Sequence, residues 1–280
     1  MKLIEKDIEL LITKEELLSL QKELRLIYGY DFKNYATASL KRRVSRFMRY
    51  SKIISFLELK YRLGTEEEFF NYFLEEVTVN VTEMFRDPSF FRAIREQVIP
   101  QLKTYPNIRI WHAGCSTGEE VYSMAILLEE EGLLERSLLY ATDINQHVLE
   151  QAKSMKFNID LMSDYASNYL AAGGKEEFSK YYTAQYGKAV FNDRLKQRMV
   201  FSTHNLVNDQ SFNEFNLVIC RNVLIYFNRE LQDNVIGLFT NSVSPLGFLA
   251  LGSKESLSFS KHEEHYNKID GKMKIWQKKR

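Results

Sequence analysis

The chain has 280 residues, of which 45% are hydrophobic and 27% charged, and its 38 Lys and Arg nearly balance its 37 Asp and Glu. This composition is typical of a globular protein and excludes a polycationic or acidic disordered chain. The two cysteines exclude a disulfide framework, and no apolar run approaches the ~20 residues that span a bilayer. We therefore expect a cytoplasmic protein without membrane insertion, whose acid-bearing N-terminal segment is not a signal peptide.

The first part of the chain carries helical periodicity throughout. Apolar residues recur every three or four positions before Gly29, at Leu17, Leu20, Leu24 and Ile27. Further helices are predicted at about 35–49, at about 53–62 with an end at Gly64, and from Thr65 onward, where three glutamates occupy the first turn. Residues 1–78 are therefore predicted to form a small helical domain.

From residue 108 onward, β-rich runs alternate with helical patterns, which is typical of a parallel sheet covered by helices on both faces. Strands are predicted at 108–115, 137–144, 199–206, 215–222 and 246–253, and helices at 119–131, 146–156 and 229–243. The final KMKIWQKK alternates in polarity and suits an antiparallel edge strand. Residues 158–198 interrupt the alternation with a Tyr-Gly turn between β-prone runs, which predicts an inserted β-hairpin subdomain. The second domain therefore covers 79–280.

Polar residues follow the predicted strands, at the sheet edge where α/β proteins bind ligands. The first strand leads into Gly114-Cys115-Ser116-Thr117-Gly118-Glu119-Glu120, and the second ends at Asp143, placed to accept both hydroxyls of a ribose. These features favour an adenosine-containing cofactor. Two carboxylates at a helix start repel phosphate and attract a cation, so S-adenosylmethionine fits this loop better than a dinucleotide does.

Four motifs together resemble the chemotaxis receptor glutamate methyltransferases, the CheR family. They are NVTEMFR (80–86), AGCSTGEEVYS (113–123), ATDI (141–144) and ICRNVLIYF (219–227), in the order and spacing of that family. The resemblance implies a small all-helical N-terminal domain joined to a Rossmann-like α/β methyltransferase domain with a β-hairpin insertion. It also implies the transfer of methyl groups from S-adenosyl-L-methionine to receptor glutamates, with S-adenosyl-L-homocysteine as the product.

The same resemblance assigns site residues. The cofactor contacts are Asn80, Thr82, Arg86, one of Glu119 and Glu120, Asp143, Asn205, Leu206, Arg221 and Asn222. The catalytic helpers are Arg86 and Tyr226. A glutamate substrate is already an anion at neutral pH, because its usual pKa is ~4.3, so the transfer requires no general base. We expect Arg86 to clamp a carboxylate and Tyr226 to orient the nucleophile.

Three of these residues also have a purely structural interpretation. Arg86 can pair with Asp87 or cap a helix, Tyr226 can be a core aromatic residue, and Asp143 can be the N-cap of the next helix. Cys115 and Cys220 are expected to be buried thiols rather than a redox pair. The histidines of the segment 262–265 lack a third ligand, so no metal site is expected.

The charge is unevenly distributed along the chain. Residues 1–64 contain 14 Lys or Arg and 8 Asp or Glu, and Arg42, Arg46 and Arg49 share one helix face. This face is either simply solvated or docks on the acidic helical domain of a receptor. Nucleic acid is not expected, because no RNA-binding motif accompanies the charge.

Several functional alternatives stay open at this point. The inserted hairpin resembles a family subdomain that binds a receptor's C-terminal tail peptide, or it is a surface hairpin without a partner. The protein is expected to be a monomer. A non-catalytic sensor of the cofactor or its demethylated product, and a methyltransferase of another substrate, are the alternative functions.

Overall fold

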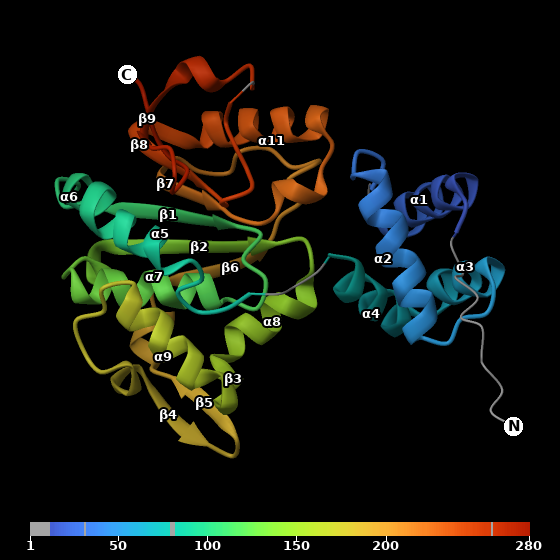
Figure 1. The fold of residues 1–280 in the computed structure, drawn as a ribbon, viewed down its shortest axis with the longest axis horizontal. Coiled ribbons are helices and arrows are strands. Elements are labelled where there is room, and N and C mark those ends of the chain that lie inside the picture. Colours follow the sequence, from blue (N-terminus) through green and yellow to red (C-terminus); the bar gives the residue numbers. More distant parts are fainter. Residues whose placement is uncertain (1–11, 31, 79–81, 259) are drawn as a thin grey trace, which may run out of the picture. The chain divides into compact units, whose positions relative to one another are not determined.

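The computed structural model describes residues 12–30, 32–78, 82–258 and 260–280 (Figure 1). Contacts divide the chain into two compact units. Met1–Val79 with Tyr226–Leu231 form the first, which we call the helical unit. Asn80–Ile225 with Gln232–Arg280 form the second, which we call the sheet unit. A short segment from late in the chain therefore belongs with the N-terminal helices.

Between residues 12 and 78, the described part of the helical unit forms four helices, as the periodicity predicts. They are α1 (Lys14–Tyr28), α2 (Thr37–Tyr50), α3 (Phe56–Thr65) and α4 (Glu67–Thr78). Gly29 ends α1 in the left-handed conformation, as expected. The prediction that the third helix ends at Gly64 is wrong, because α3 continues to Thr65. A glycine costs a helix about 1 kcal/mol, and the burial of Leu59 and Leu63 on the same helix offsets that cost.

The apolar positions predicted for α1 form its buried face with one exception, and α2 also buries one apolar face. The buried residues include Leu17, Leu20 and Leu24 on α1 and Leu40, Val44 and Phe47 on α2. Ile27 continues the same periodicity, but 47% of its surface is exposed. It lies in the last turn of α1.

The segment Tyr226–Leu231 is bonded to the chain before α2. Tyr35 and Phe227 form an antiparallel bridge, and their rings meet edge to face with centroids 5.0 Å apart. Two backbone hydrogen bonds flank this bridge, from the Ala36 N–H to the Tyr226 carbonyl at 2.9 Å and from the Asn228 N–H to the Asn34 carbonyl at 2.8 Å. The residue predicted to be catalytic, Tyr226, is thus held by the helical unit.

A seven-stranded sheet forms the centre of the sheet unit (Figure 1). Its strands are β1 (Ile108–Ala113), β2 (Ser137–Asp143), β6 (Met199–Thr203), β7 (Phe215–Cys220), β8 (Val243–Leu251), β9 (Tyr266–Asp270) and β10 (Ile275–Lys278). Their order is β6-β2-β1-β7-β8-β10-β9, and the first five are parallel to one another. The chain therefore runs outward from β1 to β6 and then crosses back to β7, which makes β1 and β7 the switch point.

The C-terminal strand is antiparallel, as predicted, but it is not at the edge. β10 pairs with β8 on one side and with β9 on the other. The edge strand β9 has a mostly exposed sequence, YNKID, which lacks the apolar alternation of a recognisable strand.

The remaining helices belong to the sheet unit or connect it to the short segment of the helical unit. The longer ones are α5 (Pro88–Ala93), α7 (Glu119–Glu130), α8 (Gln146–Ser154), α9 (Met162–Ala171) and α11 (Arg229–Ser242). The shorter ones are η1 (Ile94–Val98), α6 (Ile99–Leu102), η2 (Leu134–Arg136), η3 (Ile159–Leu161), η4 (Phe178–Tyr181), α10 (Asp193–Lys196), η5 (Leu224–Tyr226) and η6 (Glu263–His265). Residues 88–102 form one nearly continuous run whose π-helical turn, η1, precedes Pro100, a residue without an N–H to donate.

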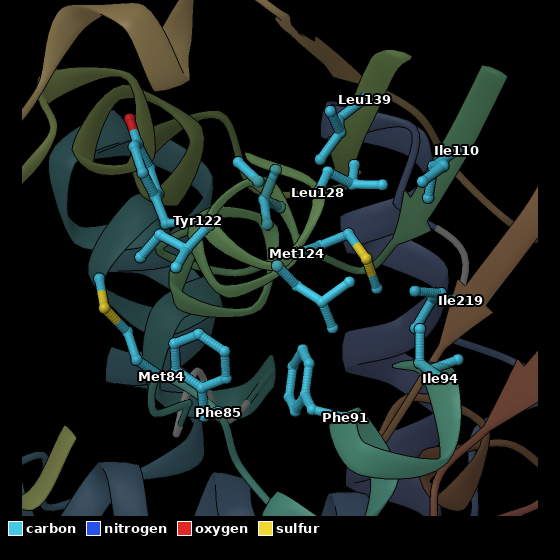
Figure 2. Close-up of a cluster of buried hydrophobic side chains, with 14 of the residues drawn as sticks. Met84, Phe85, Phe91, Ile94, Ile110, Tyr122, Met124, Leu128, Leu139 and Ile219 are labelled. Atoms are coloured by element: carbon cyan, nitrogen blue, oxygen red, sulfur yellow. The ribbon is translucent and has the colours of Figure 1, made fainter. Parts of the chain in front are cut away.

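A large apolar core packs around α7. Met124 and Leu128 of this helix lie among Phe85, Phe91 and Ile219, all of them fully buried (Figure 2). Trp111 is likewise fully buried, and its indole N–H donates to the Thr142 hydroxyl at 2.8 Å. This packing fixes β1 and the start of α7, where the polar loop predicted to bind a ligand lies.

The predicted hairpin insertion is confirmed. β4 (Tyr182–Gln185) and β5 (Lys188–Phe191) pair around a turn at Tyr186 and Gly187, both with positive φ. A third strand, β3 (Lys156–Asn158), pairs with β5 and lies just before the predicted insertion. The β-subdomain is therefore a three-stranded sheet inserted between β2 and β6.

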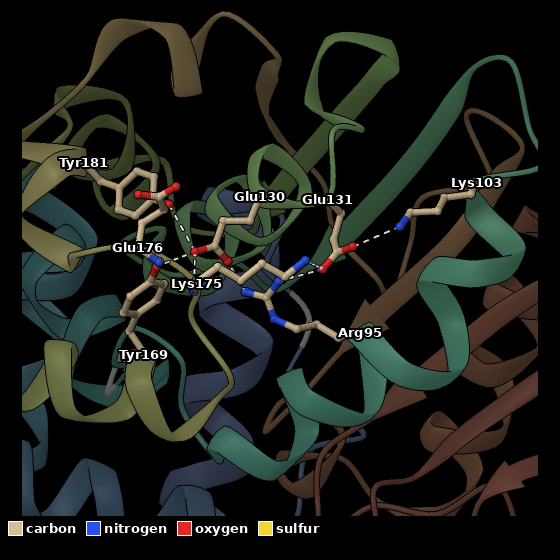
Figure 3. A network of polar contacts seen from close by, with 8 residues as sticks. All are labelled: Arg95, Lys103, Glu130, Glu131, Tyr169, Lys175, Glu176 and Tyr181. Carbon is tan, nitrogen blue, oxygen red and sulfur yellow. Dashed lines mark hydrogen bonds and ion pairs between the residues drawn. The ribbon is translucent and has the colours of Figure 1, made fainter.

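A buried polar network connects the end of α7 to the insertion (Figure 3). Glu130 accepts hydrogen bonds from the hydroxyls of Tyr169 and Tyr181 and also pairs with Arg95. Glu131 contacts the Arg95 guanidinium at 3.0 Å and the ammonium groups of Lys103 and Lys175 at 3.0 Å and 2.7 Å. Removing one member of such a network leaves a buried charge without its partner, so this network ties the insertion to the core.

We expect this network to make the protein sensitive to acid. Burial alone would raise the pKa of Glu131, but hydrogen bonds from Lys175, Lys103 and Arg95 lower it to about 2. Because the pKa is lower in the folded state than in the unfolded state, the stabilisation is complete above the unfolded pKa and is lost as pH falls toward 2. Urea unfolding between pH 7 and pH 3 should show this loss, and Glu131→Gln should reduce it. An equal loss in both proteins would contradict the prediction.

Candidate active site

Four parallel strands end at one edge of the sheet, and the predicted site residues follow them. The loop Gly114–Gly118 follows β1, Asp143 is the last residue of β2, Asn205 follows β6, and Arg221 follows β7. The register places Ala113 beside Thr142 and Asp143 beside Thr203. The ends of these strands therefore form one continuous row, with the switch point between β1 and β7.

Asp143 links this row to the loop after β1. Its Oδ2 accepts a hydrogen bond from the Ser116 N–H at 2.9 Å, and its Oδ1 accepts one from the Asn145 N–H at 3.0 Å. Burial raises the pKa of Asp143, while the same backbone hydrogen bonds oppose that rise. The alternative that Asp143 caps the following helix is wrong, because Asn145 is the N-cap of α8.

The loop after β1 requires glycine at its first position. Gly114 has a φ of +80°, and a Cβ built on it would lie 2.4 Å from Cγ2 of Val223. The backbone of this loop therefore approaches the segment after β7 more closely than any side chain would allow.

We expect Gly114→Ala to lower the free energy of unfolding by about 1–3 kcal/mol, because it adds overpacking to backbone strain. Gly132 is a matched control, with a φ of +68° and nothing within 4 Å of the added Cβ. Gly132→Ala introduces the strain alone and should cost less. Urea unfolding of both variants measures the difference, and equal losses would show that crowding at Val223 is unimportant.

The two adjacent glutamates at the start of α7 have different surroundings. Glu119 is buried and accepts a hydrogen bond from the Thr117 hydroxyl at 2.6 Å, and burial raises its pKa to about 7. Glu120 accepts from His112 Nδ1 at 3.0 Å and from Arg221 Nη1 at 3.1 Å. Burial acts to raise the pKa of Glu120, but the His112 hydrogen bond and the Arg221 charge lower it. Glu120 is therefore the one that keeps a full negative charge at neutral pH.

Arg221 joins the loop containing Arg86 to the switch point. Its guanidinium donates to Glu120, to the Asp87 carboxylate and to the carbonyl of Arg86, and it lies 4.1 Å from the centroid of the Phe90 ring. Its side chain is only 3% exposed. The predicted cofactor contact at Arg221 thus has a structural role as well, because it fixes the backbone that carries Arg86.

Strained backbone is concentrated around the same row of strand ends. Phe85, Asp87, Ser116 and Asn222 all have φ between 50° and 62°. Such conformations cost about 1–3 kcal/mol each in residues other than glycine, and they persist where the surrounding structure enforces them. Here the enforcing contacts include the Ser123 hydroxyl, which accepts from the Phe85 N–H at 2.8 Å. This pattern is typical of a functional site.

Two features of the site had only a weak signal in the sequence. Glu255, four residues after the end of β8, is 5% exposed and accepts hydrogen bonds from the N–H groups of Gly252, Asn222 and Ile225. His112 lies within an otherwise apolar strand and contacts Glu120. In the sequence, Glu255 is visible only as an acidic residue just past a predicted strand, and His112 only as a histidine inside one. Neither pattern predicts which residues they contact.

The remaining predicted site residues differ in burial and in the unit to which they belong. Asn80 lies outside the described residues. Thr82 and Leu206 are half-buried, and the Asn205 side chain accepts a hydrogen bond from the Val207 N–H at 3.0 Å. Tyr226 belongs to the helical unit, where the Arg43 guanidinium lies 4.7 Å from the centroid of its ring. Tyr226 is half-buried, and the neighbouring Phe227 is buried.

The structure also shows the surroundings of the two cysteines and of the candidate metal ligands. Cys115 and Cys220 are buried free thiols, as predicted. Cys115 lies two residues after β1, and Cys220 is the last residue of the neighbouring strand β7. Among residues 12–30, 32–78, 82–258 and 260–280, no group of His, Cys, Asp and Glu is arranged to hold a metal ion. Within the same ranges, no helix is long and apolar enough to cross a bilayer.

Unpartnered polar atoms test whether S-adenosylmethionine fits this edge. Ser116 Oγ and Asn145 Nδ2 are buried beside Asp143, and neither has a hydrogen-bond partner among the described residues. A ribose supplies hydroxyl groups that pair with such atoms, and the carboxylates of Asp143 and Glu120 suit hydroxyls and an ammonium group rather than phosphate. The residues present therefore fit this cofactor.

A parallel sheet of this strand order, with an antiparallel final strand and acids after its first two strands, defines a Rossmann-like S-adenosylmethionine-dependent methyltransferase domain. Comparison with known families agrees. Residues 80–275 match "CheR methyltransferase, SAM binding domain", and residues 15–78 match "CheR methyltransferase, all-alpha domain". The chain belongs to the CheR methyltransferase family, its cofactor is S-adenosylmethionine, and the predicted fold class is confirmed.

Similar proteins extend over most of the chain. It is 47% identical over 266 residues to a Pseudomonas putida protein named Cher3, covering 95% of this chain and 97% of that one. It is 28% identical to the chemotaxis protein methyltransferase of Listeria monocytogenes, covering 82% and 85% of the two chains. The identity is also 28% with chemotaxis protein methyltransferase 1 of Pseudomonas aeruginosa, covering 89% and 91%. The relatives therefore share both units.

Proposed function

We propose that this protein is a cytoplasmic protein-glutamate O-methyltransferase that converts receptor glutamates to γ-glutamyl methyl esters. The observation that carries the choice of an acidic protein substrate is the basic face of α2. Arg42, Arg46 and Arg49 are exposed on this helix, while Arg43 and Val44 are buried. Positive charge on one face raises the local concentration of an acidic helical domain and the rate at which it docks. The relatives named chemotaxis protein methyltransferases support the same choice.

The cofactor, when bound, supplies an electrophilic methyl group. In our proposal Asp143 accepts the ribose hydroxyls and Glu120 receives the ammonium of the methionine part, since its two known partners leave further lone pairs on its oxygens. The other proposed cofactor contacts are Asn80, Thr82, Arg86, Asn205, Leu206, Arg221 and Asn222. Glu119 is the weaker candidate for the ammonium, because burial raises its pKa to about 7.

Arg86 and Tyr226 are the proposed catalytic residues. A glutamate side chain is already a carboxylate at neutral pH, so the protein needs to hold and align it rather than remove a proton. Arg86 can hold this carboxylate with two parallel N–H groups, and its backbone is fixed by Arg221. The Tyr226 hydroxyl orients the nucleophile by a hydrogen bond.

Tyr226→Phe isolates the contribution of that hydroxyl. The ring and its cation–π contact with Arg43 are kept, so the helical unit should remain intact. We expect turnover to fall by roughly 10-fold, in line with the loss of one hydrogen bond worth about 1 kcal/mol or slightly more. Initial rates of methyl transfer at saturating cofactor measure the effect. Unchanged turnover would remove Tyr226 from the catalytic residues.

The proposed function is tested by incubating the full chain with methyl-labelled S-adenosylmethionine and receptor cytoplasmic fragments. Label on the receptor that is released as methanol by mild base supports glutamyl ester formation. Tight binding of S-adenosylhomocysteine without any transfer would instead indicate a sensor, and transfer to RNA or to a small molecule would indicate another substrate. Fragments with and without the receptor's C-terminal tail test whether the β-subdomain binds that peptide.

A further inference from the structure

His112 is a fully buried polar residue in the middle of the sheet. It lies in β1, whose sequence is IRIWHA, and none of its surface is exposed. Its Nδ1 lies 3.0 Å from Oε1 of Glu120, and its Nε2 is buried without a hydrogen-bond partner among the described residues. A buried imidazole is costly unless it makes a compensating hydrogen bond, so the contact with Glu120 is the reason this residue is tolerated.

The contact with Glu120 fixes where the ring proton lies. An ionised carboxylate only accepts hydrogen bonds, so Nδ1 must be the nitrogen that carries the proton. Nε2 makes no hydrogen bond among the described residues, so the contact through Nδ1 is the one that orients the ring. His112 therefore acts as a donor directed at Glu120.

Two buried donors hold Glu120 from different directions. His112 donates to Oε1, and Arg221, itself 3% exposed, donates to Oε2 at 3.1 Å. The glutamate side chain has three rotatable bonds, and one contact alone would leave it several orientations. With both contacts, the carboxylate is fixed at the switch point between β1 and β7.

We propose that His112 is a positioning residue for cofactor binding, which holds Glu120 so that its remaining lone pairs meet the ammonium group of the methionine part. This inference rests on the proposed function, in which Glu120 receives that ammonium. In metal sites, residues that hydrogen-bond to a metal-binding carboxylate or imidazole and orient it typically contribute 10–100-fold to the affinity for the metal. A comparable contribution is expected here.

Two ligands distinguish this role from a general structural one. S-adenosylhomocysteine carries the ammonium group, whereas 5′-methylthioadenosine keeps the adenosine and lacks the amino-acid part. Calorimetric titration of His112→Leu should show a dissociation constant for S-adenosylhomocysteine raised roughly 10-fold and an unchanged one for 5′-methylthioadenosine. Ile110→Val, a change at a buried residue of the same strand, should leave both constants unchanged.

Two amide variants keep the proposal testable if His112→Leu does not fold. His112→Asn places an amide N–H near the position of Nδ1 and should retain the affinity of the original protein. His112→Gln reaches further, toward the position of Nε2, and should lose affinity for S-adenosylhomocysteine only. Equal weakening of both ligands, or no weakening in His112→Leu and His112→Gln, would overturn the proposal. Absence of S-adenosylhomocysteine binding in the unmodified protein would instead contradict the proposed function itself.

Discussion

Replacing Arg86 with alanine is expected to reduce methyl transfer by roughly 10²–10³-fold, the usual effect of removing one charge-stabilising donor from an active site. Arg221 holds the backbone at Arg86 through its hydrogen bond to the Arg86 carbonyl at 3.2 Å. That contact does not involve the Arg86 side chain, so the loop should keep its conformation in the variant. The loss should therefore appear in turnover while the melting temperature stays nearly constant.

Two further variants sharpen the Arg86 experiment. Arg86→Lys keeps the charge but not the two parallel N–H groups, so its turnover should lie between those of the original protein and Arg86→Ala. Arg109→Ala is the matched control, because Arg109 is an exposed arginine of the sheet unit at the opposite end of β1 from the site. If Arg86→Ala and Arg109→Ala transfer methyl groups equally fast, Arg86 has no catalytic role.

Asp143→Asn is expected to raise the dissociation constant for S-adenosylhomocysteine by roughly 100-fold. Both carboxylate oxygens of Asp143 accept backbone N–H groups, from Ser116 and Asn145. An asparagine would turn its NH₂ group toward one of these donors, which misplaces the loop as well as removing the charge. In our proposal the carboxylate of Asp143 accepts hydrogen bonds from the two ribose hydroxyls. Losing both, at about 1.5 kcal/mol or more each, corresponds to this change in affinity.

The Asp143 experiment uses calorimetric titration and has an exposed control. Asp160 is an exposed residue of η3, so Asp160→Asn removes the same charge without touching the site. The dissociation constant of Asp160→Asn for S-adenosylhomocysteine should match that of the original protein. An affinity retained within threefold by Asp143→Asn would show that the ribose does not depend on this carboxylate.

The places of most candidate site residues in the fold could be predicted because strands end where apolar runs give way to polar residues. Asp143 was predicted from an apolar run followed by an acid, and the structure places it at the end of β2 beside the loop after β1. The same logic predicted the helix at 119–131, observed as α7. Local sequence patterns are enough to predict these strands and helices, because each is defined by its own residues. The carboxyl ends of parallel strands then lie at one edge of the sheet.

The features that were missed depend on partners distant in sequence. Glu120 and Arg221 are both visible in the motifs, but their contact, and those of Arg221 with the segment around Asp87, join residues more than 100 positions apart. The hydrogen bonds of Glu255 likewise have no local pattern. The edge strand β9 gave no signal because its side chains are mostly exposed and its pairing with β10 is made by the backbone.

The bridge between Tyr35 and Phe227 has a consequence for the order of folding. During synthesis the four N-terminal helices leave the ribosome long before residues 226–231 exist. Until then, residues 34–36 before α2 lack the partners of their backbone hydrogen bonds, which are Tyr226 and Asn228. The helical unit therefore reaches its final form only after most of the chain has been made, and a fragment that stops near residue 78 would lack part of that unit.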